Sequence, residues 1–572
     1  MHDLVIRGAL IIDGTGRPAY QGDVALDAAT IVQVGGKADA GRREIRADGA
    51  VVTPGFVDIH THYDAQLWWD PYLSPSSWNG VTSVVMGNCG IGFAPARPAD
   101  QEWLMGLMET VEEIPRESLR EGIRWQWESL PEFMNALDRT PLAIDIGVQV
   151  PHAAVRTYVM GERGAANAPA TPSELDRMSA IVREGVAAGA LGFTSTRTSN
   201  HRSLDGVDAP GYGVDVEELI TLAGAAAAAG VGGVAGFVLD WPDVDREIEW
   251  LRRLQQRSGL TVFTALVQSY DHPDKWRRIL ELMAAATAAG EPLYAQVPGR
   301  PIGGLAGLTS SRNPFMLHRT YQEIAARPLA ERVSVLREPA FRARLLAEKV
   351  EASTEIFRTV TGRFSRMFRL GDPPDYEPQV DASIEAVAQA RGCAPAALAL
   401  DMMLERDGKE LLFTPLGNYA GGDLEATMSM LRHPNVYLGL GDGGAHVGRT
   451  CDAASPTFML THWARDRKRG PTLPLEEVIR LQTTRTAALY GLHDRGVLAV
   501  GKKADVNVID FDGLRLHAPE MLYDLPGGAR RLVQRADGYL ATIVSGTPIF
   551  ENGVASGALP GRLIRRRSAI AV

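Results

Sequence analysis

The chain has 572 residues, of which 45% are hydrophobic, a proportion that allows a large buried core and argues against global disorder. Its 59 basic and 69 acidic residues give a formal net charge of −10, so nucleic-acid binding is not expected. The cysteines Cys89, Cys393 and Cys451 offer no disulfide framework, and the sequence has neither a signal-peptide pattern nor an apolar run of roughly 18 residues. These features predict a cytoplasmic protein that does not enter a membrane.

Both ends of the chain have the pattern of short β-strands separated by turns. The alternating, β-rich segments are residues 3–14, 24–35, 44–55, 496–512 and 539–557. Asn552-Gly553 lies between two such runs and is typical of a hairpin turn. We therefore predict one small β-sandwich domain, built from residues 1–54 together with residues 496–572.

The middle of the chain, residues 55–495, alternates short apolar runs with helical patterns. Residues 171–189 and 216–230 are examples of the helical patterns. The strand-like runs are residues 56–62, 81–88, 143–150, 190–196, 231–238, 260–267, 291–297, 411–415 and 436–442. Strands alternating with helices indicate parallel βα units, and their number is close to that of a TIM-like (β/α)8 barrel.

Residues 298–375 interrupt this alternation with a stretch rich in glycine and proline, followed by charged helical sequence. We interpret them as an insertion over the barrel mouth that could act as a lid. A helical excursion on the surface is the alternative.

The most informative motif is the segment that contains His60 and His62, which follows Pro54-Gly55. Residues two apart on a strand point to the same side, so both imidazoles would face the barrel interior. Two such imidazoles at the carboxyl end of a barrel strand can bind one metal ion. A pair of core or surface histidines is the alternative.

Two further strand ends carry groups that could complete this site. Cys89 follows the second predicted barrel strand between glycines, and zinc accepts thiolate together with imidazole. A buried, inert cysteine is the alternative. Asp442 follows the last predicted strand, where a carboxylate can bind metal and take a proton from water. His446 lies four residues further on and could stabilise an oxyanion, as could His152.

With these motifs in place, the chain resembles the N-acyl-D-amino-acid deacylase (D-aminoacylase) branch of the amidohydrolase superfamily over almost its whole length. The matching segments are residues 4–26, 51–71, 87–95, 159–178, 184–195, 439–448 and 489–512. The resemblance implies a TIM-like barrel with a β-sandwich made from both chain ends, and it implies zinc. It assigns His60 and His62 to the first-strand ligand pair, Cys89 to the branch's cysteine ligand and Asp442 to the catalytic aspartate.

The sequence departs from this branch on two middle strands. Members carry a ligand histidine on each of these strands, but the corresponding residues 232–240 and 262–269 contain none. His201 and His272 are nearby but out of register. We therefore expect one zinc ion rather than two, held by the His60–His62 pair and Asp442 with Cys89 on or near it, while two ions remain the alternative.

The groups expected to bind substrate match the resembled branch less closely than the metal ligands do. The branch holds the carboxylate of its substrate with basic residues, and Arg300 and Arg449 are the cationic candidates here, while Trp68 could line the pocket. We expect a metal-dependent hydrolase that cleaves the amide bond of a small N-acyl-D-amino acid or a related N-acyl compound. A cyclic amide, urea, carbamate or ester as substrate is one alternative, and a non-catalytic scaffold is another. Assembly into a homo-oligomer is left open.

Overall fold

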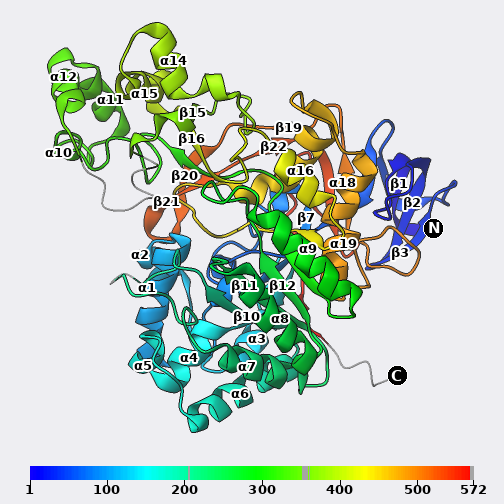
Figure 1. Ribbon diagram of the computed structural model, residues 1–572. Helices are drawn as coiled ribbons and strands as arrows, with labels where there is room; N and C mark the ends of the chain where they lie inside the picture. Colours follow the sequence, from blue (N-terminus) through cyan, green and yellow to red (C-terminus); the bar gives the residue numbers. More distant parts are fainter. Residues whose placement is uncertain (204–205, 351–358, 360, 567–572) are drawn as a thin grey trace.

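A computed structural model of the chain describes residues 1–203, 206–350, 359 and 361–566. A ring of parallel strands forms its centre (Figure 1). In chain order these are β6 (Phe56–Asp58), β7 (Val81–Met86), β8 (Asp145–Val148), β9 (Val150–Pro151), β10 (Gly192–Arg197), β11 (Val234–Leu239), β12 (Thr261–Ala265), β13 (Leu293–Val297) and β17 (Val436–Leu438). Since β8 and β9 are separated by one residue, the ring has the eight-stranded order expected of a TIM-like barrel within the described residues.

The ring closes between its first and last strands just beyond their ends. The backbone of Thr61 pairs in parallel with Gly443, and the N–H of Asp442 donates to the carbonyl of His60 over 2.9 Å. This contact brings two segments that are some 380 residues apart in sequence into register. It therefore places the residues that follow β6 opposite those that follow β17.

Helices connect the barrel strands and pack outside them (Figure 1). They include α3 (Leu130–Asp138), α4 (His152–Met160), α6 (Pro172–Ala187), α7 (Val216–Ala227), α8 (Val244–Ser258), α9 (Lys275–Ala288), α16 (Glu425–Leu431), α18 (Leu475–Gln482) and α19 (Thr484–Leu489). The helix predicted at residues 171–189 is confirmed as α6: Thr171 caps it with a hydrogen bond from the N–H of Glu174, and Pro172 occupies its first turn.

A nine-stranded sheet joins the two ends of the chain, as expected for the terminal segments. Its strands are β1 (His2–Ile11), β2 (Tyr20–Asp27), β3 (Thr30–Val34), β4 (Gly41–Arg46), β5 (Val51–Pro54), β18 (Val506–Ile509), β23 (Tyr539–Val544), β24 (Thr547–Glu551) and β25 (Val554–Ala555). Strands β5 and β18 run antiparallel and connect the two halves. The hairpin predicted at Asn552-Gly553 is confirmed, because Glu551 pairs with Val554 across these two residues.

The chain leaves the barrel after β13 and returns at β17, an excursion longer than the predicted insertion at 298–375. It contains β14 (Ile302–Ala306), α10 (Arg319–Gln322), α11 (Leu329–Arg337), α12 (Pro339–Ala347), β15 (Phe368–Arg369), α14 (Ile384–Arg391), α15 (Pro395–Met403) and β16 (Leu412–Gly417). Figure 1 shows these helices as a lobe at one end of the molecule. Residues 411–415, expected as a barrel strand, belong to β16, which pairs with β14 and β15 in the lobe. Residues 351–358 and 360 of the predicted insertion lie outside the described residues.

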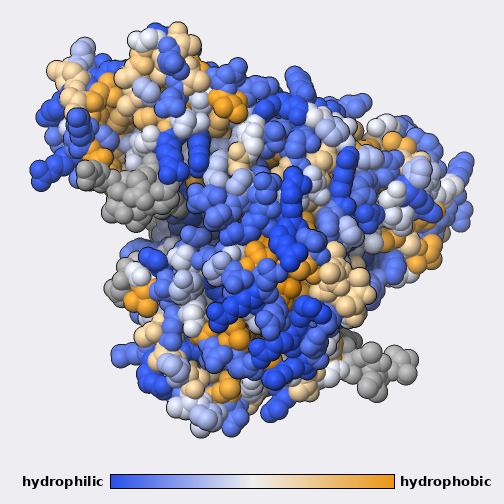
Figure 2. Space-filling view, viewed as in Figure 1, coloured by the Kyte–Doolittle hydropathy of each residue, from blue (hydrophilic) through white to orange (hydrophobic). Residues whose placement is uncertain are grey.

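The lobe has a hydrophobic core of its own, separate from the core of the barrel. Its buried members come from both halves of the excursion, for example Leu308, Leu336 and Met403. The face of the molecule in Figure 2 is mainly hydrophilic, with hydrophobic residues scattered over it. None of the described helices is long and apolar enough to cross a bilayer.

A hairpin from the C-terminal region also reaches the barrel mouth. It consists of β20 (Glu520–Leu525) and β21 (Ala529–Val533), which run antiparallel. The N–H of Leu532 donates to the carbonyl of Val447 over 2.6 Å, and an Arg530 N–H donates to the carbonyl of Thr309 over 3.2 Å. The loop after β17 is therefore fixed by both the hairpin and the lobe.

Candidate metal centre

Four side chains from three strand ends converge at the carboxyl end of the barrel. His60 and His62 follow β6, Cys89 follows β7 and Asp442 follows β17. Cys89 Sγ lies 3.4 Å from His60 Nε2 and 3.9 Å from His62 Nε2. Asp442 Oδ1 lies 3.5 Å and 3.7 Å from the same two nitrogens. The structure thus brings together all four residues that the sequence predicted as metal ligands.

The local backbone explains how Cys89 reaches the histidines. It lies in a short turn (Asn88–Gly90) with φ of 57°, a conformation that few non-glycine residues adopt. Its neighbour Gly90 has φ of 71°, and a Cβ there would come within 2.8 Å of Ser195 Cα. The turn can therefore lie against β10 only with glycine at this position. Asp442 also has a positive φ, of 45°. Two of the four groups are held in strained backbone, which is common where geometry serves function.

The donor atoms of His60, His62 and Cys89 lie within 4.8 Å of one another and suit a zinc ion, and Asp442 lies beside the two imidazoles. Tetrahedral zinc with bonds of about 2.0–2.3 Å to nitrogen, oxygen and sulfur separates its donors by about 3.3–3.6 Å. The separations of 3.4–3.9 Å from Cys89 and Asp442 to the two Nε2 atoms are close to this value. Imidazole, thiolate and carboxylate are also the ligand types that zinc accepts.

Neighbouring groups orient both imidazoles so that Nε2 faces the centre. His60 Nδ1 lies 2.7 Å from Gln296 Oε1, an acceptor on β13, so this nitrogen carries the proton. His62 Nδ1 lies 3.2 Å from the carboxylate of Glu112, the last residue of α1 (Gln101–Glu112). An acceptor on the outer nitrogen of a ligand histidine fixes its tautomer and increases its basicity, as Gln296 does for His60. Glu112 acts on His62 through its charge, because neither His62 Nδ1 nor Glu112 Oε1 forms a hydrogen bond among the described residues. The sequence analysis identified neither Gln296 nor Glu112.

Burial and charge shift the pKa values of these groups in opposite directions. Burial lowers the pKa of His60 to about 4, which keeps this imidazole neutral, as a ligand must be. Burial alone would also lower the pKa of His62, but Glu112 and Asp442 raise it well above its ordinary value. Burial raises the pKa of Cys89 to about 11, so its thiolate requires a cation beside it. Burial would raise the pKa of Asp442, yet the two histidines hold it well below its usual range.

His446 and Arg449 lie beside this centre. His446 Nε2 is 3.8 Å from Glu112 Oε2, and an Arg449 N–H donates to His446 Nδ1 over 3.3 Å. Arg449 also forms an ion pair of 3.2 Å with Glu113. A continuous chain of contacts therefore runs from His62 through Glu112 and His446 to Arg449, the cationic candidate that the structure places near the metal ligands.

The structure gives two other predicted residues, Arg300 and His152, different partners. Arg300 is 2% exposed and donates to Asp452 Oδ1 over 3.0 Å and to Gln534 Oε1 over 3.2 Å. His152 is fully buried, with Nδ1 2.7 Å from Ser195 Oγ and Nε2 2.9 Å from Glu218 Oε1. Among the described residues, the partners of these two side chains are other buried groups and not the four metal donors. Their expected roles in substrate binding therefore gain no support from these contacts.

Trp68 packs within an aromatic cluster. Its ring stacks on Trp127 at 4.9 Å between centroids, and its N–H donates to the carbonyl of Asp64 over 3.2 Å. Trp125 and Phe93 extend the cluster. The ring is partly buried and supports the loop after β6, so packing accounts for its position.

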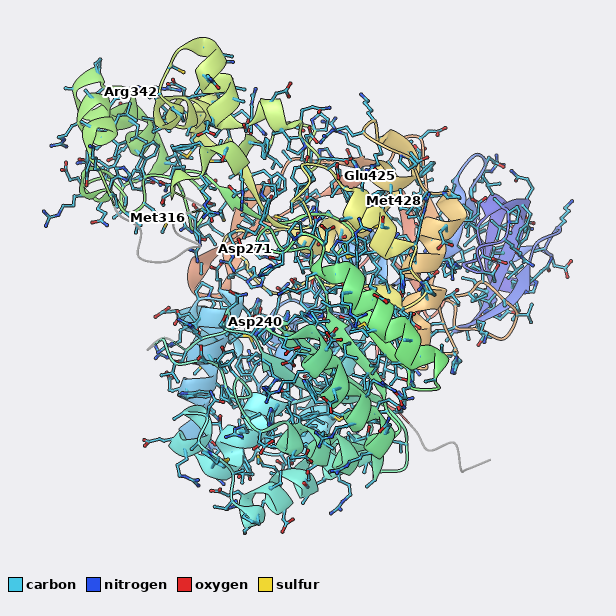
Figure 3. The ribbon with its side chains drawn as sticks, in the orientation of Figure 1. Asp240, Asp271, Met316, Arg342, Glu425 and Met428 are labelled. Carbon is cyan, nitrogen blue, oxygen red and sulfur yellow. The ribbon has the colours of Figure 1, made fainter. Side chains whose placement is uncertain are left out.

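His201, which is out of register with the middle strands, comes close to the centre through the loop after β10. Its Nδ1 lies 2.9 Å from Thr196 Oγ1, and burial together with the charge of His62 lowers its pKa to about 4. Asp240, at the end of β11, accepts a hydrogen bond of 2.9 Å from the Ser199 N–H and so holds this loop. Asp240 is labelled in Figure 3, between the barrel helices and the lobe in that view. A loop histidine thus approaches the site where the sequence lacks strand histidines.

Comparisons with known proteins agree with this architecture. A model of the amidohydrolase family matches residues 43–550. The chain is 26% identical to an N-acyl-D-aspartate deacylase of Alcaligenes xylosoxydans xylosoxydans, over 99% of this chain and 96% of the relative.

Two solved structures share the fold over nearly the whole length. A D-aminoacylase superimposes with a TM-score of 0.65 at 22% identity, covering 99% of this chain and 100% of that one. The N-acyl-D-glutamate deacylase of Bordetella bronchiseptica, solved with zinc and a phosphonate inhibitor, gives a TM-score of 0.65 at 22% identity and covers 99% of both chains. The expected resemblance to this branch is confirmed.

Proposed function

The chain belongs to the amidohydrolase family, and from that membership we propose that it hydrolyses the amide bond of an N-acyl-D-amino acid or a related N-acyl compound at a site with one zinc ion. It is an enzyme that acts on carbon–nitrogen bonds other than peptide bonds. The observation that carries the proposal is the convergence of His60, His62 and Cys89 within 4.8 Å of one another, with Asp442 beside the two imidazoles.

One zinc ion suits this chain better than two. The donors of His60, His62 and Cys89 can hold one ion and leave a position for water, and strands β11 and β12 carry no histidine for a second ion. The binuclear centre of the related D-aminoacylase is activated by one metal and attenuated by a second, so a single ion is compatible with activity in this fold. When bound, zinc supplies Lewis acidity, which makes water a nucleophile at neutral pH and polarises a carbonyl group.

Asp442 is the group proposed to move the proton. Because its carboxylate is held ionised by the two histidines, it can accept a proton from the attacking water and return it to the leaving nitrogen. His446, four residues later and 21% exposed at its side chain, is placed to donate to the developing oxyanion.

Arg449 is the residue proposed to bind the carboxylate of the substrate. It is partly buried beside His446, so its guanidinium can form charge-assisted hydrogen bonds near the centre. Arg300 is not proposed for this role, because its side chain is buried and pairs with Asp452 and Gln534.

The first experiment is metal analysis of the purified protein by inductively coupled plasma mass spectrometry, followed by a substrate panel. About one zinc per chain, with hydrolysis of N-acetyl-D-amino acids faster than of their L enantiomers, is the expected result. Metal below about a tenth of an equivalent, with no activity restored by added zinc, would contradict the proposal.

The alternative substrates are cyclic amides, ureas, carbamates and esters. The missing strand histidines favour them, because they show that the centre differs from the one the branch usually carries. Hydantoins and carbamates therefore belong in the same panel. A clear preference for either class over N-acyl-D-amino acids would replace the proposed substrate while retaining the metal-assisted mechanism.

A further inference from the structure

The turn that carries Cys89, residues 87–90, has a backbone conformation that cysteine does not favour. The φ angle is 76° at Gly87, 57° at Cys89 and 71° at Gly90, all in the left-handed region. Glycine adopts this region freely, but residues with a side chain rarely do. The turn therefore depends on contacts with other parts of the chain to keep Cys89 Sγ within 3.4–3.9 Å of the two imidazoles.

The side chain of Thr194, on β10, bridges the two ends of this turn. Its hydroxyl donates to the carbonyl of Gly87 over 2.5 Å and accepts a hydrogen bond from the N–H of Gly90 over 3.1 Å. One oxygen atom thus satisfies a backbone acceptor before Cys89 and a backbone donor after it. We propose that Thr194 is a positioning residue whose hydroxyl holds the Cys89 sulfur where it can bind the metal ion.

The surroundings of Thr194 make its hydroxyl a fixed support. Thr194 pairs with Pro151 of β9 and with Gly236 of β11, so strands on both sides hold its backbone. A β-branched side chain has few rotamers on a strand. The side chain is 1% exposed, so water does not readily replace its two hydrogen bonds. The position of the hydroxyl is therefore set by the barrel wall and not by the turn.

Asn88 holds the other side of the turn. Its amide donates to the carbonyl of Val85 over 2.9 Å and to the carbonyl of Thr61 over 3.3 Å. These bonds tie the turn to β7 and to the residue between the two histidines, but they act before Cys89. Thr194 bonds the residue after Cys89, so the two contacts together fix the cysteine from both sides.

Loss of the hydroxyl should change the metal affinity, an inference that rests on Cys89 being a metal ligand as proposed above. Thr194→Val keeps the shape of the side chain but leaves the N–H of Gly90 and the carbonyl of Gly87 without their partner. Groups that orient a metal ligand usually change affinity about 10–100-fold when they are removed. We expect Thr194→Val to lower zinc affinity at least roughly tenfold and Thr194→Ser to stay within about threefold of the native value.

The test uses protein loaded with cobalt(II) in place of zinc. A thiolate bound to cobalt(II) absorbs strongly in the near ultraviolet, whereas imidazole and carboxylate ligands do not. The native protein should show this band and Cys89→Ala should lack it. Thr194→Val should lose most of the band although Cys89 is still present, and Thr194→Ser should restore it. Zinc affinity, measured by competition with a chromophoric chelator, should follow the same order.

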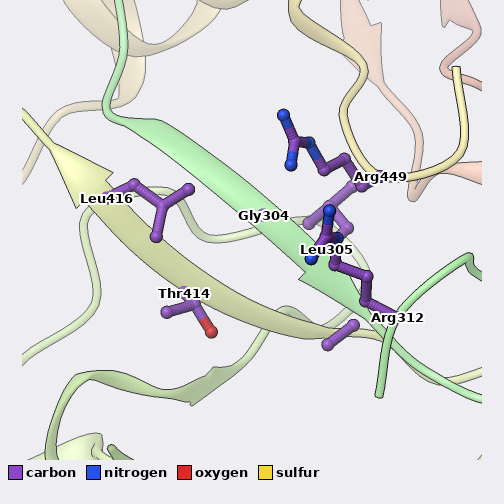
Figure 4. Close-up of a pocket in the computed structure, with 7 residues that line it drawn as sticks. Gly304, Leu305, Arg312, Thr414, Leu416 and Arg449 are labelled. Carbon is purple, nitrogen blue, oxygen red and sulfur yellow. The ribbon is translucent and has the colours of Figure 1, made fainter. Parts of the chain in front are cut away.

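Two other buried threonines provide matched controls. Thr414 is also 1% exposed, and its Oγ1 has no hydrogen-bond partner among the described residues, so Thr414→Val removes a hydroxyl without breaking a bond. Figure 4 shows Thr414 on β16, beside a small space that Arg449 also lines. Thr196 follows Thr194 by two residues on β10, and its hydroxyl contacts His201 instead of the turn. Thr414→Val and Thr196→Val should both keep the native band.

Circular dichroism establishes that each variant is folded, and Thr194→Ala is the second variant if Thr194→Val is not. A native band with native zinc affinity in either folded variant, an equal loss in Thr196→Val, or a failure of Thr194→Ser to restore the band would overturn the role of Thr194 alone. A native protein that binds cobalt(II) without the band would remove Cys89 as a ligand, and the proposed centre and this inference would fall together. The two failures are therefore distinguishable.

Discussion

Removing the negative charge of Glu112 should weaken zinc binding although Glu112 is not a metal ligand. Its carboxylate is 1% exposed and lies 3.2 Å from His62 Nδ1, on the side of the ring opposite the donor atom. The variant Glu112→Gln keeps the size of the side chain and removes the charge. Any change in affinity therefore reports the electrostatic support of His62.

The magnitude follows from the geometry. A full ion pair between Glu112 and a protonated His62, 3.2 Å apart, would be worth about 5 kcal/mol at an effective dielectric constant of about 20; this is an upper bound, because zinc-bound His62 is a neutral ligand and burial of the carboxylate offsets part of the interaction. Substitutions of groups that support metal ligands usually cost about 10–100-fold in affinity, or about 1.4–2.7 kcal/mol. We expect Glu112→Gln to fall in this range and Glu112→Ala to lie at its upper end.

The assay is competition for zinc against a chromophoric chelator, starting from metal-free protein. The adjacent Glu113→Gln is the matched control, because Glu113 faces Arg312 and Arg449 rather than His62. It should change the affinity by less than about threefold. An unchanged affinity in Glu112→Gln, or an equal loss in both variants, would refute the assignment. Circular dichroism establishes that each variant is folded.

Three further predictions concern the centre and its surroundings. Asp442→Asn should lower kcat by about 10²–10⁴-fold while zinc content by mass spectrometry stays near that of the native protein; a near-normal rate would remove Asp442 as the base. Cys89→Ala should lower zinc affinity by at least roughly tenfold in the chelator assay, and an unchanged value would make the cysteine structural. Asp58→Asn should stabilise the metal-free protein at neutral pH. Burial raises the pKa of Asp58 to about 7, so the folded protein favours the protonated carboxyl group. The protonated group contributes fully to the stability of the fold below pH 3.8, the pKa in the unfolded chain, and this contribution is lost as the pH rises to about 7. Urea unfolding should therefore give Asp58→Asn a free energy of unfolding about 1 kcal/mol or more above that of the native protein near pH 8, and a smaller difference toward pH 5. A difference that does not change with pH would contradict the raised pKa of Asp58.

The family resemblance and the strand ends could be predicted from the sequence because both depend on local patterns. His60 and His62 are two apart, so they share one side of a strand, and Cys89 and Asp442 each follow an apolar run. Carboxyl ends of parallel strands meet at one edge of a barrel, which brings such residues together without knowledge of the loops. The four donors therefore met as expected.

Groups outside the strands could not be predicted in this way. Glu112 ends a helix and Arg312 lies in the lobe, so their positions depend on how these elements pack onto the barrel. The strand-like run at residues 411–415 could not be assigned to barrel or lobe from its composition, since both environments bury apolar residues.

The sequence by itself determined that His60 and His62 lie two residues apart on one strand, and this spacing indicated a metal centre. The tertiary structure alone decided which charges surround that centre. Arg300 and Arg449 are equivalent as sequence candidates, yet one pairs internally with Asp452 while the other reaches His446. The physical reason is that a charged side chain takes the partner that packing places within hydrogen-bonding distance, and packing depends on contacts between residues far apart in the chain.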